Sequence, residues 1–279
     1  ATDPFCGTAT YDDHKGTDFR VLSLKEMAKG VSVLAVADGT VLRLRDGEAD
    51  RLIQSVDERA RLQGKECGNG LVIDQGDGWT AQYCHLREGS IQVEAGQRVV
   101  AGEPLGLVGA SGFAQFPHLH LTLRHKDRII DPICGREMGT GCDSTSSANH
   151  SLWSDEAQAW MDSADRSIMS VGLTGGLIDH DRLVETGHPP SLVADDTAIV
   201  GWGWFANLQE HDRLRIAIVA PDGATLFDAV SEPLDRAKAS YSQFAGRKRS
   251  PEPGRYAVTV EILRHGQIVE AQTENVLVQ

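Results

Sequence analysis

Residues 31–142 consist of short segments in which apolar and polar residues alternate, and this pattern constrains the fold more than any other feature of the chain. Two examples are VSVLAVADGTVLRLRDG (31–47) and NGLVIDQGDGWTAQYCHL (69–86). Alternation with a period of two is typical of half-buried β-strands, and the glycines and aspartates between the segments mark turns. One helix is predicted, over residues 55–63, as an insertion between strands. The predicted fold class is therefore mostly β.

A polar stretch of small residues, DSTSSANHS, is the predicted linker and covers residues 143–151. We expect a first domain over residues 1–142 and a second over 152–279. The second begins with a predicted short helix within 154–166 and continues as strands at near-regular spacing with PDG and RHG turns. Regular short strands of this kind predict an immunoglobulin-like β-sandwich.

The composition limits the classes of function. A content of 41% hydrophobic and 24% charged residues is that of a globular protein. The formal net charge of −13 argues against a nucleic-acid-binding protein, because the sequence has no basic stripe to neutralise phosphates. The longest apolar runs are too short to cross a bilayer, so no transmembrane segment is predicted.

All five cysteines lie in the first half of the chain, and none forms a CxxC pair. This distribution favours local disulfides in an exported domain, periplasmic or extracellular, over a zinc ribbon. Cys134 and Cys142 bracket a glycine-containing loop and are predicted to pair with each other. Cys67 and Cys84 flank a predicted hairpin, where a bridge requires a β-bulge, or else another partner. Cys6 is left without an assigned partner.

Histidines concentrate in three short motifs of the first domain. FPHLHL (116–121) carries His118 and His120 on the same face of a predicted strand, since residues i and i+2 share a face. HKGTD (14–18) places His14 four residues before Asp18, with a glycine between them that allows both side chains to reach one ion. YCHL (83–86) ends a predicted strand with His85. Each motif alone is a weak signal, but their combination predicts a catalytic metal site.

The same motifs resemble the lysostaphin-type (LytM) zinc peptidases. The resemblance runs in order from residue 10 to 133 through HKGTDF, GNGLVIDQGDGWTAQYCHL, VEAGQRVVAGEPLGLVGASG, PHLHL and DP. It implies a β-rich fold of two sheets, the duplicated hybrid motif, that encloses a groove. It also implies one Zn²⁺ per chain held by His14, Asp18 and His120, and His85 and His118 as catalytic histidines that do not bind the metal.

The implied reaction is hydrolysis of peptide bonds in peptidoglycan. Two neutral imidazoles and one carboxylate leave the ion enough positive charge to lower the pKa of water. His118 is expected to be the general base and His85 to donate a hydrogen bond to the developing oxyanion, although the two roles are interchangeable at this level. Asp12 or Asp13 is a possible second-layer partner of a ligand histidine, with a solvated acidic turn as the more ordinary interpretation.

Two alternatives to a peptidoglycan endopeptidase remain open. One is a catalytically silent cell-wall-binding regulator with the same fold, and the other is a zinc protease that acts on proteins. The second domain shows no metal or nucleophile motif, and Trp202 and Trp204 are expected in its core, not as a sugar platform. A structural role, or a role in binding a protein partner, is therefore expected for it.

Overall fold

The computed structural model describes residues 3, 10, 14–53, 55–141, 150–164 and 167–279. The chain forms two compact units, and the division falls between Gln158 and Ala159, within one helix. Each unit has a buried core of its own. The predicted linker 143–151 lies almost entirely outside the described residues, so the predicted domain bounds stay a prediction.

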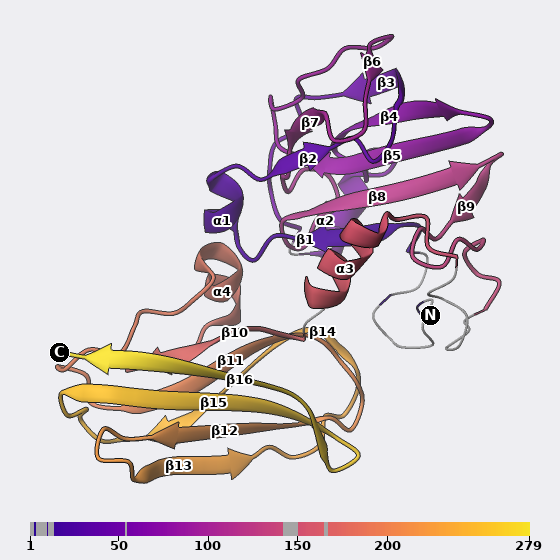
Figure 1. The fold of residues 1–279 in the computed structure, drawn as a ribbon. Helices are drawn as coiled ribbons and strands as arrows, with labels where there is room; N and C mark the ends of the chain where they lie inside the picture. The colour runs from indigo at the N-terminus through magenta and orange to yellow at the C-terminus, as the bar shows by residue number, and fades with distance from the viewer. Residues whose placement is uncertain (1–2, 4–9, 11–13, 54, 142–149, 165–166) are drawn as a thin grey trace. The chain divides into compact units, whose positions relative to one another are not determined.

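The first unit is built on an antiparallel sheet with the strand order β1-β8-β5-β4-β3-β6, in which β9 also pairs with β8 (Figure 1). The strands are β1 (Thr17–Arg20), β3 (Gly39–Arg45), β4 (Asn69–Gly76), β5 (Trp79–Leu86), β6 (Arg98–Val99), β8 (His118–His125) and β9 (Arg128–Ile130). A second sheet pairs β2 (Ser32–Leu34) with β7 (Pro104–Leu107). The predicted mostly β fold is confirmed.

Two short helices complete the strands of this unit. The inserted helix predicted over 55–63 is confirmed as α2 (Val56–Arg61). The helix α1 (Leu24–Ala28) is absent from the prediction. It begins at Ser23, whose hydroxyl accepts a hydrogen bond from the backbone N–H of Glu26, which is the usual way to satisfy a free amide at a helix start.

The large sheet has one apolar face and one polar face. The buried apolar side chains are Leu71, Ile73, Ala81, Tyr83, Leu121 and Leu123, each at most 7% exposed. Because side chains alternate along a strand, the residues between them point to the opposite face. Gln82 and His120 are two of these residues, so the polar face carries the candidate functional side chains.

The hairpin between β4 and β5 turns through Asp77 and Gly78, with φ angles of 51° and 83°. A two-residue hairpin turn of type I′ requires positive φ at both positions, and this explains the Asp-Gly sequence there. The pairing of the two strands also shifts by one residue between Asn69 and Leu71, which makes a β-bulge near the open end of the hairpin.

A disulfide joins Cys67 to Cys84 beside this bulge. Both parts of the prediction, the bridge and the bulge that it requires, are confirmed. Gly70 is the β4 residue at this point, where a Cβ atom would lie 2.9 Å from the Cys67 sulfur. The glycine therefore makes room for the sulfur to cross the sheet.

The predicted bridge between Cys134 and Cys142 is wrong. Cys134 is a free thiol and is buried, whereas Cys142 lies outside the described residues, as does Cys6. The Asp131 carboxylate accepts hydrogen bonds from the backbone N–H groups of Ile133 and Cys134, and the N–H of Gly135 donates to the Asp131 carbonyl. Cys134 lies within this tight turn, and its side chain is 4% exposed.

The segment that precedes α3 (Asp155–Ala164) is attached to the first unit. The N–H of Leu152 donates to the carbonyl of Pro132 at 2.8 Å. The Trp153 ring packs edge-on against Phe19, with ring centroids 5.9 Å apart. The helix predicted within 154–166 is confirmed as α3.

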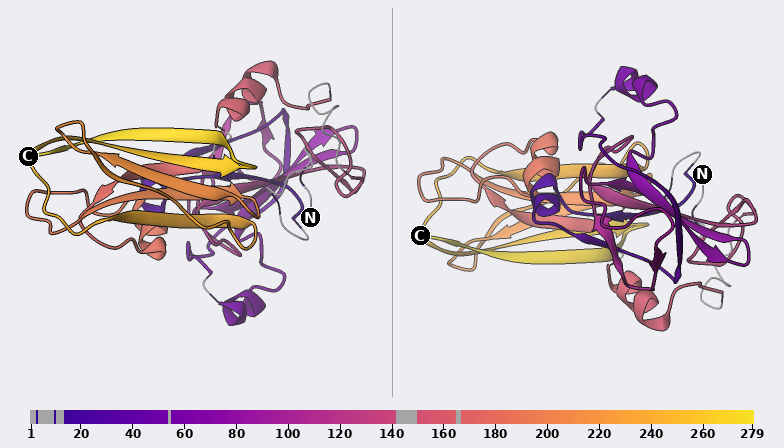
Figure 2. Two further views of the ribbon diagram at one scale, coloured as in Figure 1. Left: turned by 90° about the horizontal axis from the view of Figure 1, so that it is seen from below. Right: turned by 90° about the horizontal axis from the view of Figure 1, so that it is seen from above.

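The second unit is a sandwich of two antiparallel sheets, with the strand orders β10-β11-β14 and β13-β12-β15-β16. Its strands are β10 (Ile168–Thr174), β11 (Ile199–Leu208), β12 (Arg213–Val219), β13 (Thr225–Val230), β14 (Lys238–Arg247), β15 (Gly254–Arg264) and β16 (Gln267–Val278), and its helix is α4 (His180–Thr186). Both views in Figure 2 show these strands running along one long direction. An immunoglobulin-like relationship stays a prediction.

Apolar residues from both sheets of this unit form a single core, with Phe205, Ile216 and Val260 among its members. Trp202 and Trp204, expected in this core, are buried, at 3% and 0% exposed. They do not belong to the cluster between the sheets, because the alternating residues Gly201 and Gly203 face it and the tryptophans point to the other face of their sheet. Within the described part of the chain, no helix is long and apolar enough to cross a membrane.

Replacing Cys67 and Cys84 together by alanine is expected to lower the free energy of unfolding by about 2–4 kcal/mol, because the bridge restricts the unfolded chain. Urea denaturation followed by circular dichroism measures the difference. Peptide mapping without reduction provides the control: peptides containing Cys67 and Cys84 should remain joined, and Cys134 should react with iodoacetamide only after denaturation. A Cys134 peptide recovered in a disulfide would contradict the assignment.

Candidate metal centre

The pairing of β1 with β8 assembles the site. In this antiparallel pair Asp18 lies opposite His120, and Arg20 lies opposite His118. His14 precedes β1 and reaches the same place across Gly16. A Cβ atom at Gly16 would clash with the Leu121 carbonyl oxygen and lie 2.7 Å from the His120 Nε2 atom. Glycine at this position therefore lets the chain pass close enough to β8 for His14 and Asp18 to meet His120.

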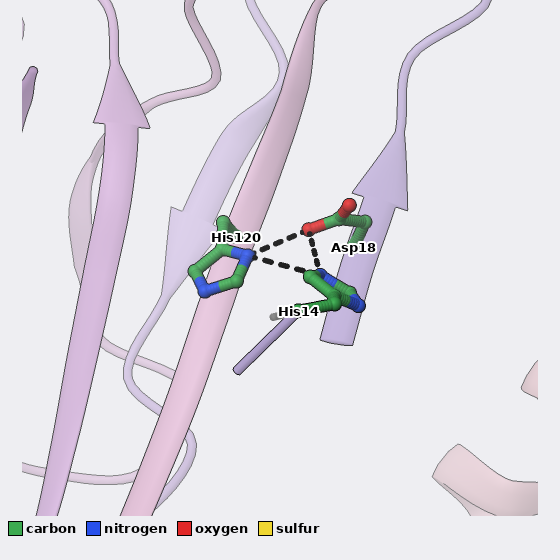
Figure 3. Close-up of side chains that lie close together, drawn as sticks. All are labelled: His14, Asp18 and His120. Carbon is green, nitrogen blue, oxygen red and sulfur yellow. Dashed lines mark hydrogen bonds and ion pairs between the residues drawn. The ribbon is translucent and has the colours of Figure 1, made fainter. Parts of the chain in front are cut away.

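Three side-chain donors converge at this point, as Figure 3 shows. The His120 Nδ1 atom lies 2.8 Å from Asp18 Oδ1 and 3.3 Å from His14 Nε2. The His14 Nε2 atom lies 3.1 Å from Asp18 Oδ1. The structure thus brings together the three predicted ligands, and this is the one metal-sized cluster of His, Cys, Asp and Glu found among the residues that it describes.

The donor set fits a divalent metal ion. Two imidazole nitrogens and one carboxylate oxygen are the ligand types of catalytic zinc sites, which keep a fourth position open. The outer nitrogen of His120, Nε2, lies 3.0 Å from the hydroxyl oxygen of Thr122, a residue that is 3% exposed. When His120 Nε2–H donates to that hydroxyl, the lone pair on Nδ1 is available to an ion.

His85 and His118 lie beside this cluster, with ring centroids 4.5 Å apart. The Nδ1 atom of His85 is 2.8 Å from the Ser111 carbonyl oxygen, and that of His118 is 2.8 Å from the Phe116 carbonyl oxygen. A carbonyl oxygen only accepts, so each neutral ring carries its proton on Nδ1. The Nε2 atom of each ring is consequently an unprotonated base.

The backbone of His85 explains its orientation. Its φ angle of 63° is positive, which is uncommon for a residue other than glycine. The residue lies at the β4–β5 bulge, and its N–H donates to the Cys67 carbonyl at 2.8 Å. Bulges commonly redirect side chains next to active sites. Here the bulge directs the His85 ring toward His118.

Burial determines the charges of these groups. Burial, aided by the nearby His118, lowers the pKa of His85 to about 3. Burial also lowers the pKa of His118. For Asp18, burial alone would raise the pKa, but hydrogen bonds with His120 and His14 outweigh it and hold the pKa well below its usual range. Near neutral pH the site therefore combines the ionised carboxylate of Asp18 with the neutral imidazoles of His85 and His118.

Sequence reasoning missed three partners of the site histidines. Thr122 is two residues beyond His120 on the same strand face, so the spacing alone could have predicted its contact with the His120 ring. Ser111 and Phe116 act through backbone carbonyls, and no residue type signals such a contact. Asp12 and Asp13 lie outside the described residues.

Comparison with known families finds a match in the first unit. Residues 12–132 match the model of peptidase family M23. The predicted lysostaphin-type resemblance is thereby confirmed for this stretch, which contains His14, Asp18, His85, His118 and His120.

Two curated relatives each match part of this chain. Cell division protein DipM of Caulobacter vibrioides is 32% identical over 93 residues, which are 32% of this chain and 15% of the relative. Peptidoglycan DD-endopeptidase ShyA of Vibrio cholerae is 30% identical over 120 residues, which are 43% of this chain and 22% of the relative. The chain thus spans less than a quarter of the length of either protein.

A solved zinc-containing peptidase of Vibrio cholerae is 29% identical to this chain. The match covers 42% of this chain and 28% of the other, with a TM-score of 0.31. A score this low supports no conclusion of its own.

Gly16→Ala is expected to reduce bound metal and to lower the free energy of unfolding by about 1–3 kcal/mol, because the added methyl group has no space between β1 and the His120 ring. Elemental analysis and urea denaturation measure the two effects. Gly176→Ala is a matched control, since a Cβ atom there meets nothing within 4 Å. Wild-type stability and metal content in the Gly16→Ala protein would show that the close approach is not required.

Proposed function

We propose that the first unit is a zinc-dependent endopeptidase domain that cleaves peptide cross-links of bacterial peptidoglycan. The observation that carries the proposal is the convergence of His14, Asp18 and His120 beside two imidazoles whose Nε2 atoms are unprotonated. The match of residues 12–132 to the family M23 model supports a peptidase, and the relatives named peptidoglycan endopeptidases support the substrate.

In this proposal His14 Nε2, Asp18 Oδ1 and His120 Nδ1 hold one zinc ion. The ion would act as a Lewis acid that lowers the pKa of water and polarises a peptide carbonyl. The Thr122 hydroxyl orients the His120 ring, and the Asp18 carboxylate supplies the negative charge of the ligand set. Three protein ligands leave room for the reacting groups.

His118 is proposed as the general base. Its Nε2 atom lies 3.7 Å from Asp18 Oδ1, next to the ligand cluster. The carbonyl of Phe116 holds its proton on Nδ1, so Nε2 is ready to accept a proton from water and to pass it to the leaving amine.

His85 is proposed to stabilise the oxyanion, but the structure adds a condition to that role. Because His85 Nδ1 donates to the Ser111 carbonyl, its Nε2 atom carries no proton while the ring is neutral. His85 must first be protonated on Nε2 before it donates a hydrogen bond to the developing charge. If the two roles are exchanged and His85 is the base, His118 must likewise be protonated on Nε2 before it donates a hydrogen bond to the oxyanion.

We also propose an exported, periplasmic or extracellular location, which the Cys67–Cys84 disulfide and the peptidoglycan-directed relatives support. The second unit is proposed to be an accessory domain. A silent regulator with the same fold, or a protease that acts on proteins, remains the alternative.

Alanine substitutions of the metal ligands and of the catalytic histidines are expected to differ in their effect on metal content. His14→Ala, Asp18→Ala and His120→Ala should each lose both metal and activity. His85→Ala and His118→Ala should keep about one zinc per chain and lose activity by roughly 10²–10⁴-fold, the usual contribution of a positioned acid or base. Elemental analysis and turnover of a cross-linked muropeptide give the two readouts, and stoichiometric zinc in His120→Ala would refute the ligand assignment.

Digestion of purified peptidoglycan is expected to release peptides whose masses show hydrolysed cross-links, and a chelator should abolish the release. Adding zinc back should restore it. Casein in a parallel reaction tests the protease alternative. A zinc-loaded protein that binds peptidoglycan without releasing peptides would favour the silent regulator.

A further inference from the structure

The polar face of the large sheet extends beyond the metal cluster to two arginines. In the paired strands Thr122 lies opposite Gln82, Gln82 opposite Val72, and Val72 opposite Arg43. Thr122 is the residue that contacts His120, so this row leads directly from the metal cluster to Arg43 on β3. Arg124 is two residues beyond Thr122 on β8 and points to the same face.

Arg43 and Arg124 come together although they are far apart in the sequence. Arg43 lines the same pocket as Gln82, the residue that Arg124 contacts, and its charge is, after burial, a further cause of the lowered pKa of Arg124. Arg124 Nη1 donates to the Gln82 side-chain oxygen at 3.0 Å. Within the described part of the chain Arg43 makes no hydrogen bond or ion pair, although Asp127 contributes some opposing charge near Arg124. Two neighbouring cations in a chain of net charge −13 indicate a site for an anion.

A pocket of about 370 Å³ lies on this part of the sheet, with Arg43 and Gln82 in its lining. Arg45 and Glu66 also line it, but both are engaged locally. Arg45 Nε donates to the Gly68 carbonyl at 2.7 Å, and Glu66 accepts from the N–H of Gly64 at 3.0 Å. Arg43 is therefore the cation that the pocket leaves available to a ligand.

The distance between the metal cluster and Arg43 matches the length of a short extended peptide. Thr122 and Arg43 are three strand spacings apart, or roughly 14 Å at about 4.8 Å per spacing. An extended peptide covers this distance with about four residues, at roughly 3.5 Å each. A chain with its scissile bond at the metal cluster thus reaches the arginines with a residue that is still close to the cleavage point.

We propose that Arg43, Arg124 and Gln82 form a subsite for a carboxylate of the peptide substrate. Guanidinium groups bind carboxylates through paired, charge-assisted hydrogen bonds, and the amide of Gln82 holds Arg124 in position. This inference rests on the proposed function and makes it more specific. The preferred substrate is a stem-peptide cross-link that carries free carboxylates, in contrast to a neutral bridge such as polyglycine.

Binding to a monomeric stem peptide tests the subsite without requiring cleavage, because a monomer has no cross-link to cut. Calorimetry on the full chain compares the free-acid peptide with the same peptide amidated at its side-chain carboxylates. Charged hydrogen bonds are worth about 1.5–3 kcal/mol, so the wild type is expected to bind the free acid roughly 10–100-fold more tightly. Arg43→Gln and Arg124→Gln should bind both forms with the affinity that the wild type shows for the amide.

Arg128→Gln is the matched control. Arg128 on β9 is 67% exposed and pairs with Glu137, so its loss changes the net charge equally but leaves the subsite intact. It should keep the full preference for the free acid. Equal binding of both peptides by the wild type, or an equal loss in Arg128→Gln, would overturn the proposal.

Cleavage of cross-linked muropeptides then separates the two proposals. A wild-type protein that prefers the free acid but cleaves no cross-link would refute the proposed function and keep the subsite. A protein that cleaves free-acid and amidated cross-links with the same kcat/KM would refute the subsite and keep the function. Circular dichroism of each variant confirms that it is folded.

Discussion

The antiparallel pairing of β1 with β8 is the constraint on which the site depends. It places Asp18 opposite His120 and brings His14 to the same point through Gly16. A slip of one residue in this register would turn Asp18 away from the polar face, because successive side chains alternate between faces. Apolar burial resists such a slip, since Leu121 is 1% exposed and Phe19 packs against the same core.

Burial around the cluster then determines its chemistry. Backbone carbonyls of Ser111 and Phe116 hold the protons of His85 and His118 on Nδ1, and burial keeps both rings neutral. The bulge beside the Cys67–Cys84 bridge gives His85 its unusual backbone angle. The Nε2 atoms of both rings are therefore oriented by the fold, as the proposed acid and base roles require.

The second unit contributes no comparable arrangement among the residues that the structure describes. Its two sheets bury a continuous apolar core, and Asp212, which is 1% exposed, is paired with Arg264 at 2.8 Å. Such features stabilise a domain without suggesting a reaction. The accessory role proposed for it rests on its attachment to a unit that matches a peptidase family, since fold alone assigns no function.

The sequence by itself determined the strands and the inserted helix and singled out the five candidate site residues, because these depend on local period and on short spacings such as HxH and HxxxD. Only the tertiary structure decided which partners those residues meet. Cys134 bracketed a loop with Cys142 but is buried by the Asp131 turn, and α1 depends on a single serine cap that the strand pattern did not reveal. Arg43 and Arg124 lie on the two outer strands of the set β8-β5-β4-β3 and are remote in sequence, so they adjoin the same residue, Gln82, only once the sheet has formed.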